Sequence, residues 1–122
     1  MVGVQLSVRP GRGCTVLGVS GELDMATSPQ LREGLRRLID GGDRQVVVDL
    51  AEVGFMDSSA LGALVVTFKA LRELDGRLSL AAVQPAVRSV LRVTSVDRAI
   101  QVYDTVQAAE ADMPPTDDAA GR

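Results

Sequence analysis

The chain has 122 residues, and the 46% that are hydrophobic suffice for the core of a single globular domain. Its 13 basic and 16 acidic side chains give a formal charge of -3, and only 2% of residues are aromatic, so it lacks the basic field and stacking surfaces that bind nucleic acid. Histidine is absent, which excludes Ser-His-Asp catalysis and most zinc sites.

Two strands are expected at the start of the chain, at residues 2–9 and 14–20, joined by a glycine-rich connection suited to an antiparallel hairpin. Cys14 begins the second strand, and as the only cysteine it cannot form an internal disulfide. We therefore expect it to serve in packing and the protein to occupy the reducing cytoplasm.

A helix should follow Pro29, with Thr27 or Ser28 as its cap and a glycine pair as its stop. Its apolar residues recur on one side, which predicts a helix that packs by one face only. These residues are Leu31, Leu35, Leu38 and Ile39.

The remainder alternates apolar runs with helical stripes, which predicts an α/β fold: a mixed sheet of four or five strands with about four helices packed mainly on one face. In the helix that begins near Ser58, the inward stripe should be Leu61, Leu64, Val65, Phe68, Leu71 and Leu74. The expected order is a strand at 45–50, that helix, a strand at 77–83, a helix from Pro85, a strand at 99–103 and a short helix capped near Thr105.

Residues 1–111 are expected to form this one domain, while 112–122 should be a disordered acidic tail because they contain little that can be buried. No window approaches the roughly 18 apolar residues of a membrane span, so we expect no membrane contact.

The most informative stretch is 55–62, with the sequence Phe-Met-Asp-Ser-Ser-Ala-Leu-Gly. If Asp57 is the N-cap, Ser58 and Ser59 occupy a first helical turn whose backbone N–H groups lack helical partners. Capping alone explains these residue types. A phosphate on Ser58 would, however, add about -1.5 to -2 charge at the surface, which could switch a protein interaction without refolding the domain.

The segments Gly21-Glu22-Leu23-Asp24 and 48–62 resemble those of the bacterial anti-sigma factor antagonists, single-domain proteins of the STAS class, over residues 1 to about 110. The resemblance implies partner switching. The unphosphorylated protein would bind an anti-sigma factor that is also a serine kinase and so free a sigma factor. The kinase, supplying ATP and magnesium, would phosphorylate Ser58, and a serine phosphatase would reset the switch.

By the same resemblance, the partner-binding residues are Asp24, Asp57, Ser58, Ser59, Ala60, Leu61 and Gly62. Ser59 is the less favoured phosphorylation site, and Asp24 is equally well explained as an acid near a helix start. Ala60 stands where many relatives have glycine, so its Cβ could hinder a kinase that approaches closely. Gly62 could keep the surface flat for a partner or allow tight packing inside.

Other functions are less well supported by the residues. A receiver domain phosphorylated at Asp49 would need an acidic pair after the first strand and a lysine late in the chain. No paired acids follow residues 2–9, and no lysine follows Lys69. A hydrolase using Ser58 has neither a Gly-x-Ser-x-Gly motif nor a histidine. We therefore expect no enzymatic activity and no cofactor. A STAS scaffold or accessory subunit of a transport or stress-signalling complex stays open as an alternative.

Overall fold

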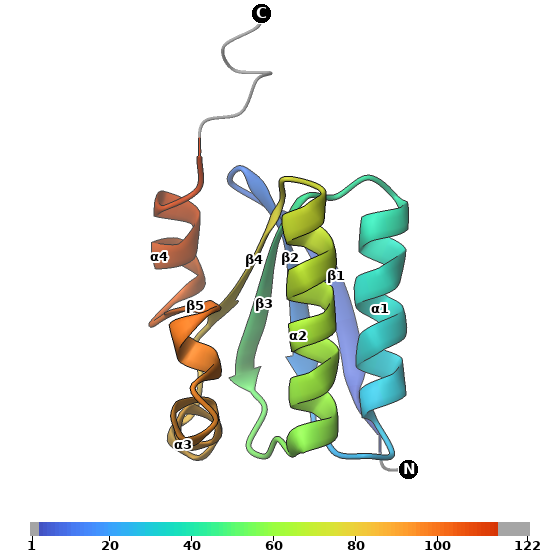
Figure 1. The fold of residues 1–122 in the computed structure, drawn as a ribbon, viewed down its shortest axis with the longest axis vertical. Coiled ribbons are helices and arrows are strands. Elements are labelled where there is room, and N and C mark those ends of the chain that lie inside the picture. The colour runs from blue at the N-terminus through green and yellow to red at the C-terminus, as the bar shows by residue number, and fades with distance from the viewer. Residues whose placement is uncertain (1–2, 115–122) are drawn as a thin grey trace, which may run out of the picture.

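A computed structural model describes residues 3–114 and contains a five-stranded sheet with its strands in chain order (Figure 1). The first two strands are antiparallel, while the second to fifth run parallel, which confirms the predicted mixed sheet. The strands are β1 (Gln5–Gly11), β2 (Cys14–Ser20), β3 (Gln45–Glu52), β4 (Arg77–Ala81) and β5 (Gln101–Tyr103).

The four helices cover the two faces of the sheet unequally, as predicted (Figure 1). Leu35, Leu64 and Leu91, one from each of the first three helices, join the main hydrophobic core with residues of the sheet. The fourth helix packs Val106 and Ala109 into a second cluster. The helices are α1 (Ser28–Asp40), α2 (Ser58–Glu73), α3 (Pro85–Val93) and α4 (Val106–Ala111), with a 3-10 turn, η1 (Val96–Arg98), before β5.

Coverage of both faces explains the unbroken apolar run in β3. Val46 and Val48 point into the main core, whereas Val47 between them points into the cluster under α4, because successive side chains of a strand alternate in direction. Cys14 packs at the edge of this second cluster, as expected for a structural cysteine. None of the helices in residues 3–114 is long and apolar enough to cross a membrane.

Several predicted boundaries were wrong for local reasons. β4 ends at Ala81 rather than at residue 83, because Ala82 adopts a left-handed backbone conformation with a φ of 59°. Leu74 was expected in the core but is 43% exposed, since α2 ends at Glu73 and Gly76 closes its last turn by a hydrogen bond to Leu71.

The end of the described chain is held against the domain. Arg77 donates to the carbonyl of Asp112 over 2.9 Å, the hydroxyl of Tyr103 donates to the Asp112 carboxylate, and Met113 packs against the second cluster. Asp112 and Met113, which were expected to begin the tail, thus contact the domain through interactions that composition does not reveal. The rest of the expected tail, residues 115–122, lies outside the described residues.

Candidate functional site

The two sequence segments singled out above meet at one end of the molecule, where β2 and β3 finish and α1 and α2 begin (Figure 1). The loop after β2 is joined to the loop after β3 by backbone hydrogen bonds. Leu23 N–H donates to the Phe55 carbonyl over 2.9 Å, and Asp57 N–H donates to the Leu23 carbonyl over 3.0 Å. The side chain of Leu23 is fully buried beneath this junction. The two loops are thus joined into one surface, which we call the platform.

Asp57 caps α2, as predicted. Its Oδ1 accepts hydrogen bonds from the backbone N–H groups of Ser59 and Ala60, over 2.9 and 3.3 Å, and from the Ser59 hydroxyl over 2.5 Å. The bond from the Ser59 hydroxyl is the main cause that lowers the pKa of Asp57, and the backbone N–H groups of Ala60, Ser59 and Met25 add to it. The backbone hydrogen bond from Asp57 N–H to the Leu23 carbonyl also ties the cap to the loop after β2.

The adjacent hydroxyls differ in their surroundings. Ser58 is exposed, and no hydrogen bond joins its hydroxyl to any residue between 3 and 114. Ser59 is half-buried, and its hydroxyl is engaged by Asp57. Because the two positions are about 100° apart around a helix, one hydroxyl faces solvent while the other turns back toward the cap.

Asp24 shapes the neighbouring loop. Its carboxylate accepts hydrogen bonds from the backbone N–H groups of Ala26 and Thr27, over 2.9 and 3.0 Å. Thr27 does not cap α1 with its side chain; instead its hydroxyl donates to the Glu22 carbonyl over 2.7 Å. The half-buried Asp24 therefore fixes the loop that lies against Asp57, so the structure brings the two predicted acids to the same platform.

The remaining predicted residues divide between core and surface. Ala60 and Leu61 are 0% and 7% exposed and belong to the main core, so the Cβ of Ala60 is buried within the domain. A Cβ at Gly62 would meet no atom within 4 Å, apart from the backbone of its own helix and its chain neighbours. Tight internal packing therefore does not explain this glycine.

Exposed apolar side chains flank the site, and these were largely missed. Met25 is 78% exposed and Phe55 is 47% exposed, each on one of the two joined loops; we call this pair the apolar rim. Exposed apolar groups that gather in one place are a common mark of protein contact surfaces. Met25 lies in a loop without periodicity, so no sequence signal distinguished it, whereas Phe55 was noted only as part of the 55–62 run.

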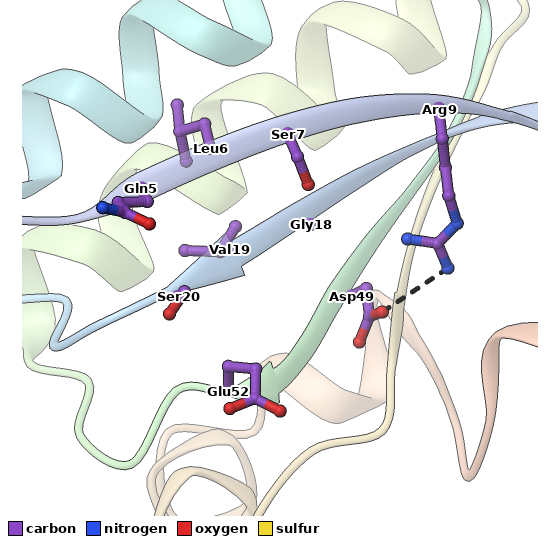
Figure 2. A pocket seen from close by; sticks show the side chains of 9 residues that line it. All are labelled: Gln5, Leu6, Ser7, Arg9, Gly18, Val19, Ser20, Asp49 and Glu52. Carbon is purple, nitrogen blue, oxygen red and sulfur yellow. Dashed lines mark ion pairs between the residues drawn. The ribbon is translucent and has the colours of Figure 1, made fainter.

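A hollow outside the joined loops lies over β1, β2 and β3 (Figure 2). It measures about 310 Å³ and is lined by both polar and apolar residues of β1, β2 and β3. Asp49 faces into it, forms an ion pair with Arg9 at 3.6 Å and accepts a hydrogen bond from the Ala51 amide. Asp49 therefore has a structural role and lies outside the joined loops. Its contacts do not support the receiver-domain alternative.

The family model described as STAS domain matches residues 5–109. Among curated proteins, an anti-sigma-B factor antagonist from Staphylococcus aureus is 36% identical over 86 residues, which cover 70% of this chain and 80% of that protein.

Solved structures give the same result. An anti-sigma factor antagonist from Mycobacterium paratuberculosis superposes with a TM-score of 0.83 and 29% identity, covering 90% of this chain and 93% of that one. An anti-sigma-factor antagonist (STAS) domain protein from Planctomyces limnophilus has a TM-score of 0.78 and 27% identity, covering 93% and 99%.

Proposed function

Because the chain belongs to the STAS domain family, among its anti-sigma factor antagonists, we propose that it binds an anti-sigma factor and thereby frees a sigma factor. We further propose that phosphorylation of Ser58 switches this binding off. The observation that carries the proposal is the exposed hydroxyl of Ser58, which makes no hydrogen bond to residues 3–114, in the first turn of a capped helix beside two exposed apolar side chains.

The apolar rim supports a binding role. Large apolar and aromatic side chains supply much of the affinity at protein interfaces when they fill pockets of the partner. Phe55 is held by a backbone hydrogen bond between the two loops, so little backbone ordering would be needed there on binding. The exposed Val66, one helical turn beyond Gly62, would extend this contact along α2.

The switch follows from charge at the centre of that contact. A phosphate on Ser58 gains about 0.3 to 1 kcal/mol from the helix dipole, but it also meets the Asp57 carboxylate, which already occupies the nearby amides. These local effects roughly cancel, so the domain stays folded. The partner must pair or desolvate the added charge, and a penalty of about 3 kcal/mol weakens binding about 100-fold.

In this mechanism the partner performs the chemistry. The anti-sigma factor is also the serine kinase and brings ATP and magnesium, and a phosphatase restores the hydroxyl. The protein itself is substrate and ligand. Asp24, Asp57, Ser58, Ser59 and Gly62 form the contact with the apolar rim, while Ala60 and Leu61 contribute by holding the first turn of α2 on the core.

The test is to incubate the protein with each anti-sigma factor kinase of its genome and magnesium ATP, and then to map phosphate by mass spectrometry. We expect phosphate on Ser58 with one kinase and none on the Ser58→Ala variant. Phosphate on neither Ser58 nor Ser59 with any kinase would contradict the switch. Binding to a transport or stress-signalling complex without phosphorylation would then favour the accessory-subunit alternative.

A further inference from the structure

We propose that Asp57 determines which of the two adjacent serines is phosphorylated, by holding the Ser59 hydroxyl in a hydrogen bond and leaving Ser58 to the kinase. The inference rests on the proposed function, since it concerns the selectivity of the same site. Asp57 acts through Ser59 and is thus a positioning residue.

The geometry of the cap supports this selectivity. One carboxylate oxygen of Asp57 accepts from both the amide and the hydroxyl of Ser59, over 2.9 and 2.5 Å. Two bonds from one residue to one acceptor fix the side-chain rotamer of Ser59 with its hydroxyl turned toward the cap. The Ser58 hydroxyl has no such bond to the described residues and remains free to rotate.

Phosphoryl transfer demands that freedom. The serine oxygen must form a bond to the γ-phosphorus of ATP while the bond to the β-phosphate oxygen breaks, ADP leaves, and the hydroxyl proton passes to the base of the kinase. At Ser58 this requires no bond within the protein to break. At Ser59 the hydroxyl must first leave a carboxylate, and the loss of one such charge-assisted hydrogen bond corresponds to about a 10-fold to 100-fold slower reaction.

The opposite role for Asp57, as a base that activates Ser59, fits the structure less well. The carboxylate already accepts hydrogen bonds from the Ser59 hydroxyl and from the backbone N–H groups of Ser59 and Ala60, and these bonds lower its pKa. A carboxylate with a lowered pKa accepts protons poorly. A phosphate on Ser59 would also place its charge against the same carboxylate, whereas Ser58 points to solvent.

The phosphorylation test uses Ser58→Ala, which leaves Ser59 as the only hydroxyl at the site, and the double variant Asp57→Ala/Ser58→Ala. With the kinase that modifies the wild type, we expect Ser58→Ala to take up almost no phosphate, and the double variant to be phosphorylated on Ser59 at least about 10-fold faster. Asp57→Asn/Ser58→Ala should lie between, because the amide oxygen is a weaker, neutral acceptor. Asp40→Ala/Ser58→Ala is the matched control and should stay unphosphorylated, since Asp40 lies at the far end of α1 and pairs with Arg36 instead of Ser59.

A kinase-free measurement covers the case in which the kinase itself needs Asp57. In low-temperature NMR spectra of the wild type, the Ser59 hydroxyl proton should exchange slowly enough to be observed and the Ser58 hydroxyl proton should not. The Ser59 signal should vanish in Asp57→Ala.

Wild-type rates of phosphorylation on Ser59 in Ser58→Ala, or equal hydroxyl exchange at both serines, would overturn the inference. Absence of phosphate on the wild type with every kinase would instead overturn the proposed function, and hydroxyl exchange would still decide the role of Asp57.

Discussion

The backbone amide of Asp57 donates a hydrogen bond to the carbonyl of Leu23 over 3.0 Å, and this bond joins two loops that are distant in the sequence. Leu23 and Met56 also form an isolated parallel bridge at the same place. The helix cap beside Ser58 is therefore positioned partly by the loop after β2. Stability and partner binding should respond together when this junction is weakened.

Leu23→Ala should destabilise the protein and also weaken binding to the anti-sigma factor. Removal of a fully buried leucine typically costs about 2 to 5 kcal/mol, and here the loss falls at the junction of the two loops. Leu35→Ala is the matched control, because Leu35 is equally buried but lies in the middle of α1. Urea unfolding and binding titrations should show similar destabilisation for both variants, with reduced affinity only for Leu23→Ala. Equal affinities of Leu23→Ala and Leu35→Ala for the anti-sigma factor would show that the junction does not affect binding.

Gly62→Ala should raise stability and lower affinity. The new methyl group meets open space, and alanine is favoured over glycine within a helix by up to about 1 kcal/mol. If a partner packs closely against Gly62, the same methyl group keeps it away. Thermal unfolding and a binding titration measure the two effects. A more stable variant with unchanged affinity would remove Gly62 from the interface.

Ala60→Gly, which introduces the residue expected in many relatives, should destabilise the protein by about 1 kcal/mol, because glycine is a poorer helix residue. Phosphorylation of Ser58 should proceed at the wild-type rate, since the side chain of Ala60 is buried in the core. Denaturant unfolding and the initial rate of phosphate incorporation provide the comparison. Faster phosphorylation of the glycine variant would show that the methyl group obstructs the kinase after all.

The cap should make stability depend on pH in the acid range. The Ser59 hydroxyl, followed by the surrounding N–H groups, lowers the pKa of Asp57 below the ordinary 3.8. A carboxyl group with a lower pKa in the folded than in the unfolded state stabilises the fold above the unfolded value, and this contribution disappears as pH falls through the folded value.

The difference in unfolding free energy between wild type and Asp57→Asn should therefore be constant near neutral pH and shrink below about pH 4. The pKa of Glu33 is lowered in the same direction by hydrogen bonds from Arg36 and Arg37, but both proteins contain this group, so its effect cancels. Urea unfolding of both proteins between pH 7 and 3 provides the measurement. A difference that stays constant throughout would contradict the cap's predicted contribution.

Local patterns were enough to predict most of the fold. The valines of β3 indicated a buried strand, and Asp57 with two serines correctly located the start of α2, because apolar runs and caps depend on neighbouring residues. Leu74 satisfied the helical spacing but lies one residue beyond the helix, so periodicity alone placed it wrongly. Ala82 adopts a left-handed backbone conformation, which alanine as a residue type does not indicate.

The site was predicted less completely, because it depends on contacts between distant segments. The residues alone could not decide between Ser58 and Ser59, and only the family resemblance favoured Ser58, since the surroundings of the two hydroxyls depend on the direction in which Asp57 points. It also could not tell that Ala60 faces the core while Gly62 faces open space. Met25 went unnoticed because its position next to the cap arises only when the two loops pair.

The central claim is that charge at Ser58 controls binding, and the most direct test is the affinity of the anti-sigma factor for Ser58→Ala and Ser58→Asp. Both variants retain Asp57 as the helix cap, so they differ chiefly in charge at the exposed position. We predict that Ser58→Ala binds like the unphosphorylated wild type, whereas Ser58→Asp binds at least about 10-fold more weakly, a difference of about 1.4 kcal/mol. Equal affinities of the two variants, measured by titration calorimetry, would contradict a charge-based switch.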